Sequence, residues 1–363
     1  LFQVMPIFFI VGGYANAVSL ESAQRRGVGY AAWLETRLNR LVKPLLALLL
    51  GWAFIAAVLY FSGVSGDVTR LASRAALIPT WFLAIYIMVV VLAPATYRAW
   101  RRWGFASFWA LASVAAMVDI AFFAADLQWL GWSNYFWIWL SVHHLGYAWR
   151  DGRMGSPARL LTYSALGLMG LGLLVFNGPY PLAMVGSPDE GLSNSLPPKI
   201  TLLMLGITQF GLLLAVEAPM RRLLSGIRVW AATVLINSMI MTLYLWHLTV
   251  MVVVVAIAFQ AGGPGLGLEP GSADWWVTRP LWIAILYTAL LPVTLLLSRF
   301  ERHVRAADAA VPAAARLVAG AVLLCLGVAL LARFGFGSAP LPWLDIAAFL
   351  MVVAGAAISG LLH

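Results

Sequence analysis

Charge is what this sequence has least of. Only 10% of its 363 residues are Asp, Glu, Lys or Arg, whereas 63% are hydrophobic. Soluble domains carry ~25% charged and ~45–50% apolar residues, so there are too few polar side chains here to cover a water-facing surface. The mean hydropathy of +0.90 agrees with this. The composition excludes a soluble enzyme and a disordered chain, and it favours a helical protein that crosses a membrane many times.

Cysteine and the common catalytic signatures are almost absent. The single cysteine, Cys325, lies in an apolar run, which excludes a disulfide framework and a cysteine-based metal cluster. The patterns G-x-x-x-x-G-K-[ST], H-E-x-x-H and G-x-S-x-G do not occur. Residues 262–267 are glycine-rich, but they follow an apolar run and precede acidic residues, which indicates a flexible loop rather than a dinucleotide fingerprint. We expect no dedicated metal site.

Long apolar runs are what the sequence has in abundance. Eleven of them, bounded by Pro, Gly or charge, predict an all-α, polytopic bundle of transmembrane helices, with ten or twelve spans as the alternatives. The runs cover residues 1–18, 44–62, 77–95, 105–125, 134–149, 159–176, 200–217, 232–259, 276–298, 314–333 and 341–362. The fifth run is short and rich in tryptophan, and the eighth is long enough to be tilted or to protrude.

The net charge of +9 is distributed in small groups between these runs. Every second loop is basic, and the basic groups are Arg25 to Lys43, Arg98 to Arg102, Arg150 to Arg159, Arg221 to Arg228, and Arg299 to Arg305. The other loops hold Asp67, Asp126, Asp189, Glu190, Glu269 and Asp274. This alternation indicates membrane topology rather than a nucleic-acid groove. The positive-inside rule then predicts a multi-pass protein of the cytoplasmic membrane with a cytoplasmic C-terminus.

The same rule has a consequence for the first run. Residues 1–18 must cross from outside to inside, so Leu1 begins on the external face. The chain starts without Met and without a charged segment typical of a signal peptide. We therefore expect a further helix upstream that carries the chain across first.

Polar residues inside the apolar runs are the candidate functional groups, because each costs a few kcal/mol unless it is paired or faces water. Asp119 lies in the fourth run, His143 and His144 in the fifth, and His247 in the eighth. All lie in the outer halves or near the middle of their runs, so an Asp–His contact between helices is possible. Adjacent histidines point about 100° apart on a helix, so only one of His143 and His144 can face such a partner squarely.

Three interpretations of these groups are open. A histidine oriented by a carboxylate suits general acid–base catalysis. The same groups suit a proton relay in a transporter. Each group can also form a purely structural hydrogen bond between helices.

Two further patterns are notable. Arg37 and Arg40 are three residues apart, on one face of a helix that leads into Lys43 and Pro44. They can bind an anion such as the phosphates of a nucleotide cofactor, or they can simply set the topology. The pair Gly12-Gly13 in the first run lets either another helix or a thin acyl chain approach the backbone closely.

Four of these stretches together resemble membrane-bound acyltransferase family 3, in particular its actinobacterial-type members. The matching segments are Pro6-Ile7-Phe8-Phe9 with Gly12-Gly13-Tyr14; Arg37, Arg40 and Pro44; Trp139-Leu140-Ser141-Val142-His143-His144-Leu145-Gly146; and Tyr244-Leu245-Trp246-His247. The resemblance covers residues 1–300 and implies an acyltransferase-like transmembrane domain there. Residues 301–363 then form two additional C-terminal helices.

The resemblance implies that the chain transfers an acyl group, usually acetyl, from cytoplasmic acyl-CoA to a hydroxyl or amine. Acceptors in the family are typically envelope glycans, lipids or secreted metabolites. Arg37 and Arg40 would then contact the CoA phosphates, while Asp119, His143 and His247 would line the site where the acyl group meets its acceptor. The proposed catalytic histidine of the family lies on the helix before Pro6, which is the helix that the charge pattern also predicts upstream.

The leading hypothesis is therefore an acyl-CoA-dependent acyltransferase with the lipid bilayer and a glycan, lipid or metabolite acceptor as its partners. The first alternative is a proton-coupled transporter or flippase of a glycolipid or small metabolite, in which Asp119 and the histidines carry protons. The second is a membrane scaffold without catalytic activity, in which changes at His143 and His247 have no effect.

Overall fold

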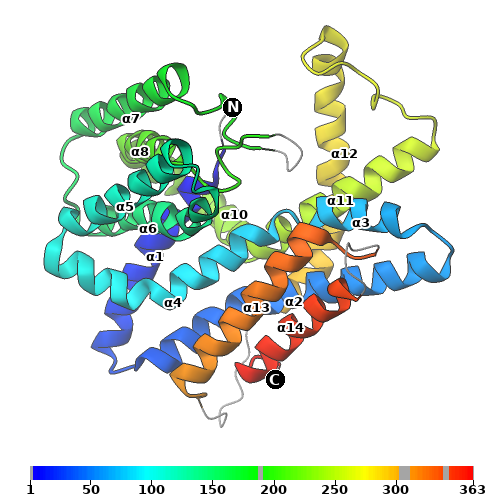
Figure 1. The fold of residues 1–363 in the computed structure, drawn as a ribbon, viewed down its shortest axis with the longest axis horizontal. Helices are drawn as coiled ribbons and strands as arrows, with labels where there is room; N and C mark the ends of the chain where they lie inside the picture. The colour runs from blue at the N-terminus through cyan, green and yellow to red at the C-terminus, as the bar shows by residue number, and fades with distance from the viewer. Residues whose placement is uncertain (1–2, 187–190, 302–310, 338–342, 363) are drawn as a thin grey trace. The chain divides into compact units, whose positions relative to one another are not determined.

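The computed structural model describes residues 3–186, 191–301, 311–337 and 343–362. These residues form fourteen α-helices and two short 3-10 helices and contain no strand (Figure 1). The all-α, polytopic helix bundle predicted from the apolar runs is thereby confirmed. Asp189, Glu190, Arg302 and Arg305 of the charge pattern lie outside the described residues.

Seven of the described helices are long and apolar enough to cross a membrane. They are α2 (Tyr30–Phe61), α4 (Thr80–Trp103), α5 (Phe105–Ala124), α7 (Pro157–Asn177), α11 (Ile240–Gln260), α12 (Ala273–Leu297) with the 3-10 helix Ser298–Glu301, and α13 (Ala314–Phe334). An eighth span arises if α8 (Ile200–Ala215) and α9 (Glu217–Leu224), which meet at a 54° bend, are counted together. The number of eleven spans stays a prediction.

The other helices are shorter or more polar. The first run forms α1 (Met5–Arg25), and the tryptophan-rich fifth run forms α6 (Asn134–Arg150) after the 3-10 helix Gln128–Ser133. The last run forms α14 (Leu344–Ile358), which has only 15 residues. At 1.5 Å per residue this helix is about 22 Å long, short of the ~30 Å hydrocarbon core.

Two segments differ from the sequence prediction. The run 232–259 is not one helix but two, α10 (Ile227–Asn237) and α11, separated at Ser238 and Met239. The Ser238 hydroxyl donates to the Leu235 carbonyl oxygen at 2.7 Å, and such side-chain bonds to the backbone compete with helix continuation. An amphipathic helix, α3 (Gly66–Leu77), also precedes α4 where only a loop was expected.

The contacts divide the chain into two compact units. Unit 1 comprises Leu1–Tyr30 and Val89–Trp230, and unit 2 comprises Ala31–Met88 and Ala231–His363. Helices α4 and α10 each belong partly to both. The C-terminal helices fall within unit 2, and the proposed domain boundary near residue 300 stays a prediction.

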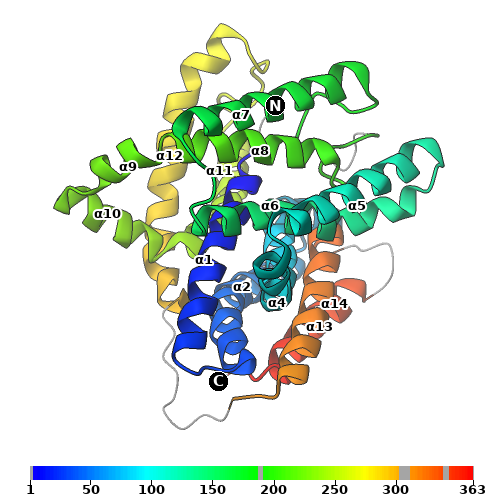
Figure 2. The same ribbon diagram turned by 90° about the vertical axis from the view of Figure 1, so that its left-hand side faces the viewer.

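Unit 1 is built on close helix contacts. Helix α1 crosses α6, and α7 lies along α8 (Figure 2). A methyl group on Gly13 would overlap the His143 carbonyl oxygen, and one on Gly146 would overlap that of Ile10. Helix α6 therefore occupies the face that Gly13 leaves open, so at this position the glycine serves helix packing rather than an acyl chain.

Unit 2 is held together by contacts between distant parts of the sequence. Helices α13 and α14 pack through Gly320, Gly327 and Gly355, where any Cβ would overlap the partner helix. The buried Ser73 hydroxyl of α3 donates to the Phe336 carbonyl oxygen and accepts from the Phe336 N–H. This reciprocal pair joins α3 to the end of α13.

Candidate functional site

Arg37 and Arg40 both lie on a helix, as expected from the sequence; this helix is α2, and both residues belong to unit 2. Arg40 is exposed and Arg37 is half-buried, with its guanidinium 5.9 Å from the centre of the Trp33 ring. The helix continues through Pro44 without ending, so one rigid element positions both side chains. Two adjacent guanidinium groups in this setting are able to bind a phosphate through several charge-assisted hydrogen bonds.

His247 also belongs to unit 2, on α11, and is partly exposed. Its Nδ1 lies 2.6 Å from the Tyr244 carbonyl oxygen. A carbonyl oxygen can only accept, so Nδ1 carries the proton and the lone pair of the neutral ring is on Nε2. The local backbone thus presets the tautomer in which Nε2 acts as a base.

A row of aromatic rings connects Arg37 to His247. Tyr86 of α4 lies within electrostatic range of Arg37 and stacks on Phe82, with ring centres 5.7 Å apart. Phe82 packs edge-on against Tyr244 at 5.5 Å, and the Tyr244 hydroxyl donates to the Pro79 carbonyl oxygen. Helices α2, α4 and α11 therefore place Arg37 and His247 at opposite ends of one row of side chains, in which Arg37 and Tyr86 interact electrostatically and the other members are in ring contact.

Asp119 lies in unit 1 and is 99% buried, with both carboxylate oxygens occupied. Oδ1 accepts from the Asn134 amide at 2.9 Å. Oδ2 accepts from the Tyr180 hydroxyl at 3.1 Å and from the Ile200 backbone N–H at 2.8 Å. Ile200 is the first residue of α8, so the carboxylate satisfies a free N–H at a helix N-terminus, where negative charge is favoured.

Lys199 is a buried cation next to Asp119. Its ammonium lies 3.6 Å from the centre of the Phe122 ring and donates to the Pro197 carbonyl oxygen. Burial lowers the pKa of Lys199 to about 8, while the charge of Asp119 acts in the opposite direction. Burial also raises the pKa of Tyr180 above its ordinary value. These contacts hold Tyr180 and Lys199 against the end of α5 and the start of α8.

His143 and Asp119 are not hydrogen-bonded to each other. The Nε2 atom of the fully buried His143 lies 3.1 Å from the Asn16 amide nitrogen of α1. Asn134, which binds Asp119, precedes His143 by nine residues on α6, which is about 13 Å along the helix axis. His144 turns its Nδ1 to the Leu140 carbonyl oxygen instead. The proposed Asp119–His143 pair is therefore not formed.

Several buried polar atoms of α1 and α6 lack a hydrogen bond to any described residue. His143 Nδ1, His144 Nε2 and Asn16 Oδ1 are buried and have no hydrogen-bond partner among the described residues. Buried polar atoms of this kind are usually satisfied by ordered water. Asn16 and His143 pack α1 against α6. Among the described residues, no carboxylate is hydrogen-bonded to Asn16, His143 or His144.

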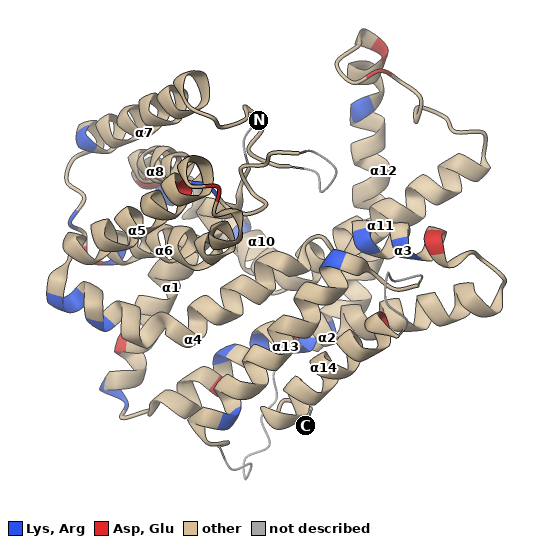
Figure 3. Cartoon of the chain, in the orientation of Figure 1, with Lys and Arg blue, Asp and Glu red and all other residues tan. Residues whose placement is uncertain are grey.

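Several arginines of unit 1 gather at one end of its helices, here termed the basic end (Figure 3). Arg101 and Arg150 both lie within electrostatic range of Glu21, Arg153 lies next to Gly104 at the start of α5, and Arg150 and Arg221 line one cavity. Arg150 pairs with Glu21 at 2.7 Å, and Arg153 pairs with Asp151 at 3.3 Å. Residues of the basic loops after the third, fifth and seventh runs thus lie near one another within unit 1.

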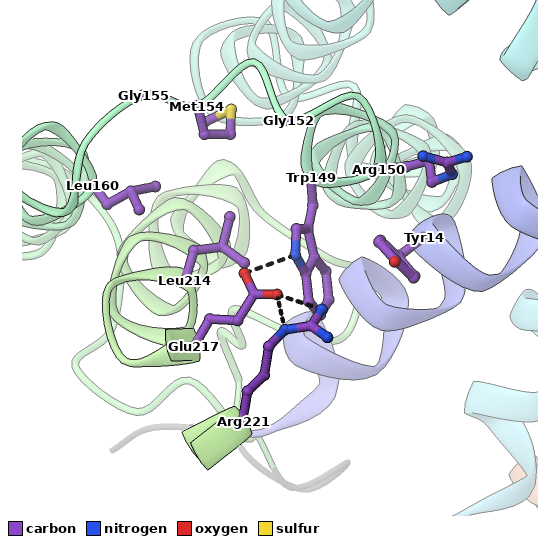
Figure 4. Close-up of a pocket in the computed structure, with 10 residues that line it drawn as sticks. All are labelled: Tyr14, Trp149, Arg150, Gly152, Met154, Gly155, Leu160, Leu214, Glu217 and Arg221. Carbon is purple, nitrogen blue, oxygen red and sulfur yellow. Dashed lines mark hydrogen bonds and ion pairs between the residues drawn. The ribbon is translucent and has the colours of Figure 1, made fainter. Parts of the chain in front are cut away.

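A cavity of about 290 Å³ opens at this basic end (Figure 4). Glu217 accepts from the Trp149 indole N–H at 3.1 Å and from the Arg221 guanidinium at 2.6 Å. Tyr14 lies against Trp149, with ring centres 4.5 Å apart. From the sequence alone Arg221 indicates membrane topology, and its spacing of four residues from Glu217 also indicates a paired helix face.

Comparison with known proteins adds one match. A family model described as an acyltransferase domain matches residues 1–299. No curated protein and no solved structure matches the chain. The matched region contains every candidate residue described above. In the described part of the chain, no group of three or more His, Cys, Asp or Glu side chains is placed to hold a metal ion.

Proposed function

The chain belongs to acyltransferase family 3, and from this premise we propose that it transfers an acyl group, most simply acetyl, from acyl-CoA to a hydroxyl or amine. In this proposal the donor binds from the cytoplasm. The acceptor is a glycan or lipid of the envelope, or a secreted metabolite. The family alone supports membrane acyl transfer, and the donor and acceptor are the proposed part.

The observation that carries the proposal is the aromatic row between Arg37 and His247. Arg37 and Arg40 bind the phosphates of CoA, which places the thioester along α2. His247 Nε2 accepts, or relays, the proton of the acceptor hydroxyl as its oxygen attacks the thioester carbonyl. The carbon–sulfur bond breaks, the acyl group stays on the acceptor and the CoA thiolate leaves with a proton. Holding both partners in one assembly supplies the proximity that the reaction needs.

The contacts of Asp119 favour this enzyme over a proton-coupled transporter. A carrier carboxylate must change partners as it takes up and releases its proton. Both oxygens of Asp119 are instead engaged by three donors from α6, the segment 178–199 and α8. In the proposal, Asp119 and the buried His143 maintain the packing of unit 1, and the chemistry belongs to the helices of unit 2.

The test uses membranes that contain the expressed protein and acetyl-CoA labelled in its acetyl group. We expect label to enter an envelope fraction. We expect Arg37→Ala to raise KM for acetyl-CoA by about tenfold or more, because charge-assisted hydrogen bonds to phosphate are lost. His247→Ala should lower kcat by about 10²–10⁴ with little change in KM, as for the loss of a general base.

Arg228→Ala is the matched control, since Arg228 is an exposed arginine of unit 1 remote in sequence from both motifs, and it should leave both constants unchanged. Absence of transfer to any envelope fraction, together with unchanged CoA binding in Arg37→Ala, would refute the enzyme. Proton movement that needs no acyl-CoA and is abolished by Asp119→Asn would establish the transporter instead.

A further inference from the structure

The cavity at the basic end of unit 1 has no role in the proposed transfer. Its polar lining comes from three different elements: Tyr14 of α1, Trp149 and Arg150 at the end of α6, and Glu217 and Arg221 of α9 (Figure 4). These are the charged and aromatic groups that commonly orient a ligand in a pocket. The cavity lies within unit 1 and shares no residue with the assembly of Arg37 and His247.

A second cavity of about 380 Å³ adjoins the first and shares three of its residues, Trp149, Glu217 and Arg221. The rest of its lining is almost entirely apolar and consists of Leu213, Val216, Met220, Leu224, Ser225 and Trp230. A charged compartment and an apolar groove therefore meet at one row of hydrogen-bonded side chains. This combination fits an amphiphile with a charged head and a hydrocarbon chain.

The charged compartment presents its arginines in fixed positions. Glu217 holds the Arg221 guanidinium through Nε at 2.7 Å and is itself held by Trp149. Nη2 of Arg221 also pairs with Glu217, but the side chain remains 67% exposed, so the N–H groups that are not directed at Glu217 can meet a ligand. Arg150 is held in the same way by Glu21 and is 37% exposed. Preorganised guanidinium groups are well suited to a phosphate.

The position of the cavities indicates the source of that phosphate. Helix α8 bends by 54° into α9, all of whose residues are at least partly exposed. Helix α9 carries Met220 and Leu223 together with Arg221 and Arg222, the pattern of a helix that lies in the membrane interface. Arginines outnumber carboxylates at this end of unit 1, which attracts an anionic rather than a zwitterionic headgroup.

We propose that the two joined cavities bind one anionic phospholipid. Its phosphate lies against Arg221, Arg150 adds to the positive charge of the cavity, and one acyl chain follows the groove lined by Leu213, Val216 and Met220. Glu217 and Trp149 are positioning residues that hold Arg221 at the junction. A lipid in this place ties the ends of α6 and α8 to the bilayer surface, independently of the acyl transfer proposed above.

The experiment measures lipid retained by the purified protein in native mass spectrometry after exchange into defined detergent. The probes are phosphatidylglycerol, phosphatidylcholine, sn-glycerol 3-phosphate and acetyl-CoA. We expect phosphatidylglycerol to bind at least about tenfold more tightly than phosphatidylcholine. Glycerol 3-phosphate should not be retained after detergent exchange, because it has no hydrocarbon chain to occupy the groove. Neither glycerol 3-phosphate nor acetyl-CoA should displace the bound phosphatidylglycerol.

Arg221→Ala should weaken phosphatidylglycerol binding by about tenfold, which is the usual effect of losing a charge-assisted hydrogen bond. Arg222→Ala is the matched control, because it removes the same charge from the next residue, which does not line either cavity. An equal loss of phosphatidylglycerol binding in both variants would show that the effect comes from general surface charge, and it would contradict the proposed site. Equal retention of phosphatidylcholine by the wild-type protein, or displacement of phosphatidylglycerol by acetyl-CoA, would overturn it without any variant.

Discussion

At the scale of single residues, Asp119 shows how a polar group inside a membrane helix is stabilised by hydrogen bonds from several elements. Its carboxylate accepts from a side-chain amide, a phenol and a backbone N–H. Hydrogen bonds to the ionised form offset the cost of burial. The Ile200 N–H is the group that cannot find a partner within its own helix. Asp119 thus connects α5 to the start of α8.

Replacing Asp119 tests this structural role. Asp119→Ala leaves three donors without their acceptor, so we expect it to destabilise the protein by about 2–4 kcal/mol. Asp119→Asn keeps one acceptor oxygen, so its stability should lie between that of the wild type and that of Asp119→Ala. The measurement is thermal unfolding of the purified protein in detergent.

Asp126→Asn serves as the control for Asp119, because Asp126 is exposed and asparagine tolerates its positive φ of 53°. It should leave the unfolding temperature unchanged. An Asp119→Ala protein that melts with the wild type would show that the three hydrogen bonds contribute nothing net.

The histidines illustrate a second point at this scale. His247 and His143 both occur in motif-like segments, yet their surroundings differ. His247 is partly exposed with its Nε2 lone pair directed away from the Tyr244 carbonyl, whereas His143 is fully buried against Asn16. For the proposed acyl transfer, accessibility therefore favours His247 as the group that exchanges a proton with the acceptor, whereas the contact of His143 is with Asn16 of α1.

At the scale of elements, the crossing of α1 and α6 depends on two glycines that face each other. A Cβ on Gly13 would overlap the His143 carbonyl oxygen, and one on Gly146 would overlap backbone atoms of Ile10 and Tyr14. Close backbone approach of this kind maximises van der Waals contact, which drives helix association where no water is present to drive it. The Asn16–His143 hydrogen bond lies next to this crossing.

Gly13→Ala should therefore separate the two helices. We expect a loss of stability of about 1–3 kcal/mol from overpacking, measured by thermal unfolding in detergent. The control is Gly172→Ala on α7, where no atom lies within 4 Å of the added methyl group. That change should be neutral or stabilising by up to about 1 kcal/mol, since alanine is the better helix former. Equal behaviour of the two variants would contradict the close crossing.

At the scale of the whole molecule, the distribution of charge is the clearest regularity. Arg101 of α4, Arg150 of α6 and Arg221 of α9 share one end of unit 1, while Asp119, Tyr180 and Lys199 lie near the other ends of α5, α7 and α8. Helix α7, with 21 residues, is about 31 Å long and joins the two ends. This length matches the hydrocarbon core of a bilayer.

The predicted topology can be measured with two cysteine variants in a Cys325→Ala background. Ala158→Cys places a thiol at the start of α7 on the basic end, and Ala183→Cys places one in the segment beyond its other end. If the basic end is cytoplasmic, a membrane-impermeant maleimide should label Ala183→Cys in intact cells and Ala158→Cys only after permeabilisation. Labelling of Ala158→Cys alone in intact cells would reverse the orientation.

Helix content, the presence of membrane spans and the acyltransferase family were all predictable from the order of the residues. Each depends on neighbours in the chain: an apolar run, the charge of the loop after it, or a motif of a few positions. The placement of Arg37 and Arg40 on one face of a helix was predictable for the same reason. The break at Ser238 and Met239 was missed, because it lies within one continuous apolar run.

Which polar groups meet was decided only by the tertiary structure. Asp119 pairs with Tyr180 and Ile200 rather than with His143, and Asn16 meets His143 across 127 positions of sequence. The joined cavities around Trp149 and Arg221 likewise require elements that are far apart in the chain. The depth of a residue in the membrane can be estimated by counting residues from the end of its apolar run. The rotation of each helix about its axis, which sets these contacts, depends on how all its neighbours pack.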